Sequence, residues 1–485
     1  MKFPGFIGPS YVSQAITADQ EELYNWYLEL MESQAATTDA ALYPTPGVSQ
    51  LSVSIAGPGR AHLYINGREF AVIGATFVEI DSAGTQTSRG TVATDDNPAT
   101  ISSNGDGGGE LFVTSGSNGY VFDLASNVLT QIAFLNGKAT MGDHLDGYFL
   151  ALNANTSTLY VSALLDGTTW SSLQFIQRNS APDKWVAVKV NGPYIWLLGS
   201  QTSEVWYDAG TFPMPLAKYP GGLIPHGCAA PFSVAIVGKE IAWLGSSRTG
   251  GAYVVSAAGF TPTVISTYPM QSAMEDYTLV SDAQGDSYTD RGHTFYLLSF
   301  PRQNVTWAWD SETRLWAKRG TWIAEDNVYI AWRPRWHAFA FNQHRTLDSN
   351  AGSLYRMALS IPTDVDSRPI RRMRRAPALE GENERIFYSS FQLDLEPGLG
   401  TSTGQGLDPQ AMMRQSNDGG KTWGNEQWRS AGKIGNYQWR VIWNRCGAGR
   451  RRVFEIAVSD PTPWKLTQAY LTLGQAPSGQ ARPAA

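Results

Sequence analysis

The chain has 485 residues and a formal net charge of −6, and only 16% of its residues are charged, against about 25% in a typical globular protein. This balance excludes a basic nucleic-acid coat protein, and no segment reaches the ~18 consecutive apolar residues of a membrane span. Aromatic residues make up 12% of the chain and 48 residues are glycine, which favours an all-β protein with short strands and many turns.

Residues 1–60 differ in composition from the rest of the chain and are predicted to be an extended N-terminal leader with a docking role. Within it, Thr17 and Gln20 resemble a helix capping box. The residues at 24, 26, 28 and 30 are Tyr, Trp, Leu and Leu, and their alternation with less apolar residues is typical of a strand. We favour the strand. The N-terminus lacks the apolar run of a secretory signal, so we expect synthesis in a cytosol.

From 61 to 360 one pattern recurs: aromatic and branched strands separated by turns such as Asn66-Gly67, Asn118-Gly119 and Asn191-Gly192. The units succeed each other at roughly 35 to 50 residues, which is the spacing of β-propeller blades. Closing such units into a ring buries their apolar faces and removes open sheet edges. The sequence predicts a β-propeller of about six or seven blades, with a pair of sandwiches as the alternative.

A charged, proline-containing stretch over 363–384 marks a boundary. Residues 361–475 contain fresh strands and predict an antiparallel, β-sandwich-like module, which we expect the N-terminal leader to join. The small and polar residues 476–485 predict a flexible tail.

The segment SNDGGKTW inside this module is the Asp-box known from sialidases and other β-propeller proteins. Its positions of interest are Ser416, Asp418, Gly420, Thr422 and Trp423. Sialic acid hydrolysis also needs an arginine cluster, a Tyr nucleophile and an acid, whereas the chain has one Asp-box and no second copy. We interpret it as a structural hairpin turn.

Other candidates for chemistry are weak. Asp143 and Asp146 flank His144 in what reads as a loop before a strand, but a metal site would need a third ligand close by. The glycine-rich segment 105–110 lacks the Lys-Ser/Thr and the helix of a phosphate cradle. Cys228 and Cys446 lie far apart and are expected to be buried thiols. The sequence therefore predicts no catalytic residue, no cofactor and no metal.

Basic residues gather in two places. The first group is Arg368, Arg371, Arg372, Arg374 and Arg375, and the second is Arg450, Arg451 and Arg452. On a strand, the side chains at 371 and 375 point to one face and those at 372 and 374 to the other, so the run is no single phosphate-binding stripe. We expect a solvated hinge or an inter-subunit salt-bridge surface, with contact to DNA phosphates as the alternative.

Several stretches, in order, resemble one family. They are FIGPSYVSQAITADQEELYNWYLELMES with LYPTPG, GHTFYLLSFPRQNVTWAWDSETRLWAKRG, SRPIRRMRRAPAL, RIFYSSFQLDLEPGLG, SNDGGKTW with its continuation, and RRVFEIAVSD. Together they are similar to the tail accessory proteins of short-tailed bacteriophages, the packaged-DNA stabilisation or tail nozzle proteins. The region from about 60 to 280 matches this family only in style.

The resemblance implies a structural virion protein of the tail, without catalytic residues, that forms a ring of six copies below the portal adaptor. This nozzle would extend the DNA exit tube, retain the packaged genome and let it pass during ejection. The implied partners are further copies of the chain, the portal adaptor, tail spike, fibre or needle proteins, and duplex DNA bound without sequence specificity; no membrane insertion is expected. The alternative is a glycan-binding or glycan-cleaving propeller protein.

Overall fold

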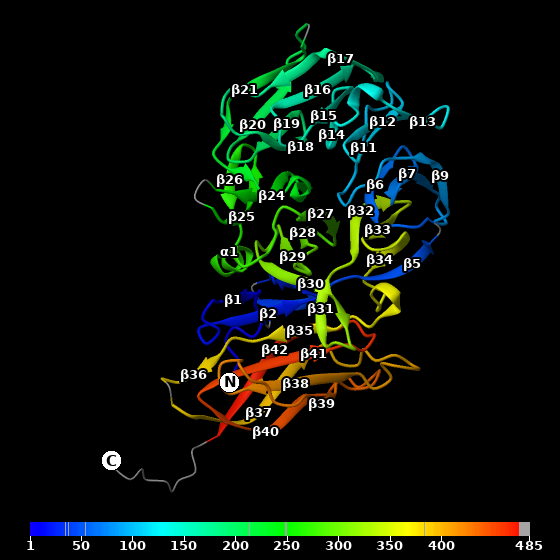
Figure 1. The fold of residues 1–485 in the computed structure, drawn as a ribbon. Coiled ribbons are helices and arrows are strands. Elements are labelled where there is room, and N and C mark those ends of the chain that lie inside the picture. The colour runs from blue at the N-terminus through cyan, green and yellow to red at the C-terminus, as the bar shows by residue number, and fades with distance from the viewer. Residues whose placement is uncertain are drawn as a thin grey trace. The chain divides into compact units, whose positions relative to one another are not determined.

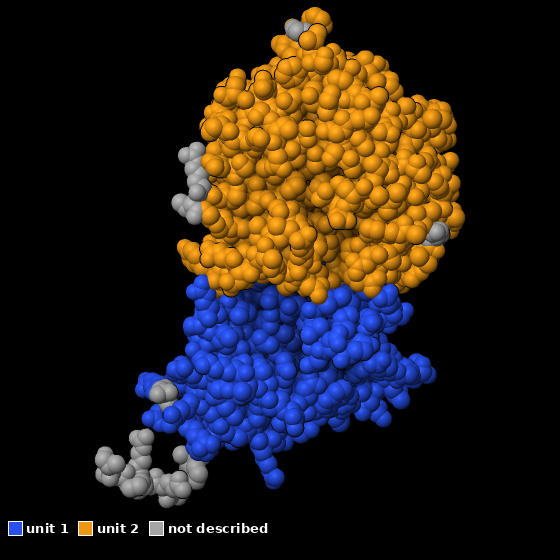
Figure 2. All heavy atoms as spheres, in the orientation of Figure 1, with its two compact units in different colours: residues 1–48, 307–330, 358–485 blue, residues 49–306, 331–357 orange. Residues whose placement is uncertain are grey.

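The computed structural model describes residues 1–474 except 34, 37, 54, 213, 248, 249 and 383, so the tail predicted over 476–485 lies outside the described residues. The chain divides into two compact units, which Figure 2 shows in blue and orange. Unit 1 comprises residues 1–48, 307–330 and 358–485, and unit 2 comprises residues 49–306 and 331–357. The units therefore do not follow the linear limits expected from composition.

Unit 2 is a β-propeller, and Figure 1 shows its blades following one another through the chain from blue to yellow. Blades 1 to 4 are four-stranded antiparallel sheets. Their strands are β6 (Gly59–Ile65), β7 (Arg68–Ile73), β8 (Thr76–Ile80) and β9 (Gln86–Thr91); β10 (Thr100–Ser103), β11 (Glu110–Ser115), β12 (Asn118–Asp123) and β13 (Val128–Gln131); β14 (Met141–Leu145), β15 (Tyr148–Leu152), β16 (Thr158–Ala163) and β17 (Asp166–Gln177); and β18 (Trp185–Asn191), β19 (Tyr194–Gly199), β20 (Ser203–Asp208) and β21 (Leu216–Ile224).

Blades 5 to 7 follow, which makes seven blades among the described residues. This number lies within the predicted six or seven. Blade 5 contains β22 (Gly227–Cys228), β23 (Ala235–Val237), β24 (Glu240–Ser246), β25 (Ala252–Ala258) and β26 (Thr261–Val264). Blade 6 begins with β27 (Gln284–Asp290) and β28 (His293–Phe300). Blade 7 contains β32 (Pro334–Ala340), β33 (Gln343–Asp348), β34 (Ser353–Ala358) and β5 (Gly47–Val53). Because β5 comes from the N-terminal side of the propeller, chain segments from both its ends share blade 7 and tie the ring closed. A short helix, α1 (Tyr268–Glu275), precedes β27.

The hairpin turn predicted at Asn66-Gly67 is present, whereas the one predicted at Asn118-Gly119 lies at a different position. Asn66 and Gly67 both have positive φ, 50° and 76°, as a type I′ hairpin requires. The turn expected at Asn118-Gly119 lies two residues earlier, at Gly116 and Ser117, and β12 begins at Asn118. Gly119 is instead a packing position, because a Cβ there would lie 2.4 Å from the Leu135 side chain.

Unit 1 is a β-sandwich in which the leader takes part, as predicted. One sheet has the order β3 (Trp26–Leu30), β4 (Ala40–Pro44), β42 (Leu466–Gly474), β37 (Ile386–Leu395) and β40 (Val441–Gly449). In the other, the strands follow in the order β29 (Val305–Asp310), β30 (Trp316–Ile323), β2 (Gln20–Tyr24), β35 (Arg372–Arg375), β41 (Arg451–Val458), β38 (Gln410–Ser416) and β39 (Gln427–Ser430). The short strands β1 (Tyr11–Val12), β31 (Val328–Ala331) and β36 (Leu379–Glu380) pair with β2, β30 and β41. The core of unit 1 contains Phe391, Trp443 and Phe454 with Phe3 and Phe6.

The leader forms strands rather than a helix, but it is broken at Asn25. This residue has φ 59°, a conformation that Asn tolerates better than most residues. Its side-chain amide donates to the carbonyls of Gly320 and Arg371 and accepts from the Gly320 amide. The break sends β2 into one sheet of the sandwich and β3 into the other.

Candidate functional site

The arginine run expected on a surface lies inside unit 1, on β35. Arg374 is fully buried and donates to the carbonyls of Gly5, Phe6 and Pro9 and to Glu21. Arg372 is also buried and donates to the Thr45 carbonyl. Burial lowers the pKa of Arg372 to about 10. Both guanidinium groups are used to attach the leader segments to the sandwich.

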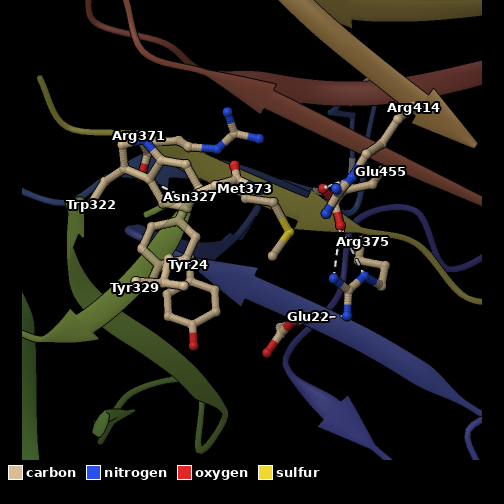
Figure 3. Close-up of a pocket in the computed structure, with 11 residues that line it drawn as sticks. Glu22, Tyr24, Trp322, Asn327, Tyr329, Arg371, Met373, Arg375, Arg414 and Glu455 are labelled. Atoms are coloured by element: carbon tan, nitrogen blue, oxygen red, sulfur yellow. Dashed lines mark hydrogen bonds and ion pairs between the residues drawn. The ribbon is translucent and has the colours of Figure 1, made fainter. Parts of the chain in front are cut away.

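Arg371 and Arg375 point to the opposite face, as the strand alternation predicts, and Figure 3 shows both lining a pocket with Met373. Arg371 binds Glu426 at 2.9 Å and lies over the Trp322 ring. Arg375 bridges Glu22 at 2.9 Å and Glu455 at 2.8 Å. Each of these guanidinium groups is thus engaged by carboxylates of its own unit.

The second basic group divides in the same way. Arg452 is buried and donates to Asn417, Gln415 and the Cys446 carbonyl. Arg450 is exposed, and Arg451 lies 3.7 Å from Glu380.

Arg368, from the first group, pairs with Glu325 at 3.1 Å. The expected surface role must be corrected for the four buried residues, Arg371, Arg372, Arg374 and Arg452, because each is at most 8% exposed and its guanidinium group binds internal acceptors.

The Asp-box forms the loop between β38 and β39, and its polar groups bind one another. Ser416 donates to Asp418 at 2.6 Å, while the Thr422 amide and hydroxyl donate to the same carboxylate at 2.9 and 2.6 Å. These hydrogen bonds hold the pKa of Asp418 below its usual range. Gly420 has φ 89°, and a Cβ there would collide with the Gln20 side chain. Trp423 lies over the guanidinium groups of Arg375 and Arg414 at 5.0 and 4.8 Å. These contacts fit a structural turn.

Replacing Asp418 by alanine should lower the free energy of unfolding of unit 1 by about 1–2 kcal/mol, because the Thr422 amide and hydroxyl lose their acceptor while remaining open to water. Denaturant unfolding followed by tryptophan fluorescence would measure it. Asp408→Ala is the matched control, since the Asp408 carboxylate accepts from the Ser430 hydroxyl and braces no comparable turn. Equal losses in the two variants would contradict the bracing role of Asp418.

Unit 2 has a cavity of about 300 Å³ on the propeller axis, lined by inner strands of all seven blades. Asp143 lies there with Lys189, 3.4 Å from its carboxylate. Residues 141–145 form β14 rather than the expected loop, and the turn comes at Asp146, with φ 48°. No cluster of three or more possible metal ligands occurs among the described residues. Cys228 and Cys446 are free and buried, as predicted.

Asp286, which also lines the axial cavity, should make the stability of unit 2 depend on pH. Burial raises its pKa to about 6 from 3.8, against hydrogen bonds from the His337 and Ser287 amides. The folded state then binds the proton more tightly than the unfolded state, so stability rises as pH falls from about 6 towards 4.

Asp286→Asn should remove this slope, which amounts to about 1–2 kcal/mol after allowance for solvent in the cavity. The measurement is the difference in unfolding free energy between the two proteins from pH 4 to 8. Taking this difference cancels the opposite effect of His337, whose pKa burial lowers to about 3. A difference independent of pH would contradict the assignment.

The pocket of unit 1 was not found by sequence reasoning. Glu22 and Tyr24 lie in the leader, Trp322 and Tyr329 in the inserted segment 307–330, and Glu455 near the C-terminus. Only the alternation of β2 and the arginine spacing could have indicated one shared face.

The comparisons with known proteins identify the family. Residues 18–361 match the model described as bacteriophage P22 Gp10, beta-propeller, and residues 371–474 match that described as bacteriophage P22 Gp10, beta-sandwich. No curated protein matches the chain. None of the helices among the described residues has the length and apolar character needed to cross a membrane.

Three solved structures show distant similarity to the chain. PorZ of the Porphyromonas gingivalis type-IX secretion system is 12% identical at TM-score 0.37, covering 71% of this chain and 44% of its own. Virginiamycin B lyase from Staphylococcus aureus is 9% identical with a TM-score of 0.41, and the match covers 64% of this chain and 99% of the lyase. A putative 6-phosphogluconolactonase from Bacteroides uniformis is 16% identical with a TM-score of 0.39, and the match covers 64% of this chain and 98% of the other. The chain thus spans less than half of PorZ, and these likenesses carry no functional argument.

The two family matches together cover nearly the whole chain, in the order of its propeller and sandwich segments. The chain therefore belongs to the bacteriophage P22 Gp10 family and is a structural, DNA-stabilising protein of a phage tail.

Proposed function

We propose that copies of this protein assemble into a closed ring of six, the nozzle of the tail, which extends the DNA exit tube, retains the packaged genome and lets it pass during ejection. The observation that carries the proposal is the ordered match of both Gp10 domains along one chain. The portal adaptor above and tail spike, fibre or needle proteins below are the proposed neighbours.

The propeller geometry supports a tube made from several copies. The axial cavity of unit 2 holds about 300 Å³ and is lined by side chains that include Met141, Phe232 and Trp336. A DNA duplex cannot pass through it. A conduit must therefore lie between copies, in a ring closed by heterologous contacts.

The charge distribution supports a tube through which DNA passes without being bound tightly. The net charge is −6, and four arginines of the two basic groups are buried against acceptors of unit 1. Few clustered cations are left to neutralise phosphates, so DNA would slide rather than bind. A glycan-cleaving function is not favoured, because the Asp-box is engaged in its own turn and Arg371, Arg374 and Arg375 already bind carboxylates of the chain.

Electron microscopy and native mass measurement of the purified protein test the ring directly. We expect closed rings with a central opening, and particles made without the protein should package DNA and then lose it to added nuclease. A protein that stays monomeric at high concentration, with DNA equally protected in its absence, would contradict the proposal.

A matching prediction concerns DNA affinity. At ~0.15 M salt the protein should bind duplex DNA more weakly than ~10⁻⁴ M, the weak end of non-specific binding. Filter binding or fluorescence anisotropy over a salt series measures it, with Arg450→Ala as a variant expected to change nothing. Micromolar affinity with a steep salt dependence would show a surface that holds DNA.

A further inference from the structure

The pocket of unit 1 has a volume of about 240 Å³ and two unlike walls. Figure 3 shows the aromatic wall, where the rings of Tyr24 and Tyr329 stack 4.0 Å apart and Trp322 lies beside Tyr329 at 4.8 Å. Arg375, Arg414 and Glu455 form the opposite wall, and Met373 lies between the two. The ring of the Asp-box residue Trp423 lies 5.0 Å from the Arg375 guanidinium and 4.8 Å from that of Arg414. The pocket therefore combines a flat apolar surface with guanidinium groups.

The carboxylates of this pocket are already bound. Glu455 accepts from Arg375 at 2.8 Å and from Arg414 at 2.6 Å. Glu22 accepts from Lys318 at 2.6 Å and from Arg375 at 2.9 Å. Burial alone would raise the pKa of Glu22, but these cations hold it below its ordinary value. Both carboxylates thus already bind cations of the chain, so neither is a ready acceptor for a ligand donor.

Hydrogen-bond donors, in contrast, remain. The Nε of Arg371 is buried and has no hydrogen-bond partner among the described residues, and the side chain as a whole is only 9% exposed. Arg414 uses Nε for Glu455, and its two terminal nitrogens have no hydrogen-bond acceptor in the described part of the chain. A buried donor without an acceptor is costly. The pocket consequently offers the terminal donors of Arg414 on the wall opposite the tyrosines, while Arg371 lies beside Trp322 on the aromatic side (Figure 3).

We propose that this pocket binds the C-terminal carboxylate of a peptide that ends in an aromatic or apolar residue, supplied by a neighbouring protein. A cavity of about 240 Å³ fits one large side chain rather than a nucleotide or a fold. A planar carboxylate matches the fork of a guanidinium group, and the apolar part of the residue packs on the tyrosine wall. That the neighbour is a virion protein rests on the proposed function, whereas the ligand chemistry does not.

DNA phosphate is the less suitable anion. The Glu22 and Glu455 carboxylates lie in the same pocket, and a chain of phosphates entering it would bring further negative charges against them. A single carboxylate at the terminal nitrogens of Arg414 brings only one further negative charge near Glu455, which the same guanidinium group already binds. The geometry therefore favours a peptide over a nucleic acid.

Saturation-transfer NMR on the full chain tests this with N-acetyl-phenylalanine as the probe and N-acetyl-phenylalaninamide as its neutral match. We expect transfer to the acid and little to the amide. Arg414→Gln should weaken binding about tenfold, the loss expected for one charged hydrogen bond. Val328→Trp should abolish it by filling the mouth, since Val328 lines the pocket and is 45% exposed. Arg429→Gln, at an exposed position on β39, should leave it unchanged.

Thermal unfolding of each variant separates loss of the site from loss of the fold. Equal transfer to acid and amide, no transfer to either, or unchanged binding in a folded Val328→Trp protein would each overturn the proposal. Displacement of the acid by equimolar inorganic phosphate or by a short DNA duplex would assign the pocket to phosphate and also overturn it. Because the isolated protein is used, failure of ring assembly leaves this result unaffected.

Discussion

Replacing Arg374 by alanine should lower the free energy of unfolding of unit 1 by about 3–5 kcal/mol, the range found when one partner of a buried ion pair is removed. The guanidinium group is fully buried and its nitrogens lie 2.6 Å from the Phe6 carbonyl and 2.8 Å from those of Gly5 and Pro9. Without it, three carbonyls and Glu21 lose their donor together. The first residues of the leader should then detach from the sandwich.

Denaturant unfolding measures the loss in stability, and limited proteolysis near residues 1–19 measures the detachment. Arg385→Ala is the control, because Arg385 is exposed and its loss should cost less than about 0.5 kcal/mol. Arg374→Lys should fall between the two, since an ammonium group keeps the charge but cannot reach several acceptors in the guanidinium plane. A loss below about 1 kcal/mol for Arg374→Ala would show that the leader is held by other contacts.

The arginine run at 368–375 was predicted to lie on a surface for a physical reason. Arginine is almost never fully buried unless it is paired, and the nearby sequence shows no single partner. The partners of Arg372, Arg374 and Arg375 lie at Thr45, Glu21 and Glu22, more than 300 positions away in the chain. The side-chain alternation was predictable because it depends only on local geometry.

The blade pattern was predictable for a similar reason. Strand and turn signals such as Asn66-Gly67 are local, and their repetition indicated the propeller. The assignment of residues 307–330 to unit 1 and of β5 to blade 7 depends on pairing between distant segments. The break at Asn25 was predictable only in part. The strand pattern on either side could be read from the sequence, but the φ of 59° depends on contacts to the distant residues Gly320 and Arg371.

The second large effect is expected at the seam where blade 7 meets blade 1. There the side chains of His62, Glu69 and Arg345 have no exposed surface. Glu69 accepts from Arg345 at 2.6 Å and lies 2.7 Å from His62 Nε2. Arg345 also donates to the carbonyls of Asp81 and Ser82. The carboxylate thus balances a buried cation that links β33 of blade 7 to blade 1.

Glu69→Gln should therefore destabilise unit 2 by about 3–5 kcal/mol, because the amide keeps the shape but leaves the buried Arg345 charge without an anion. Calorimetry measures the loss, and hydrogen exchange should show β6 and β33 opening first. Glu79→Gln is the matched control: Glu79 binds Arg68 and Arg89 but is 17% exposed, so its loss should cost about 1 kcal/mol or less. Equal effects of the two variants would mean that apolar packing between the blades, rather than this buried ion pair, keeps the ring closed.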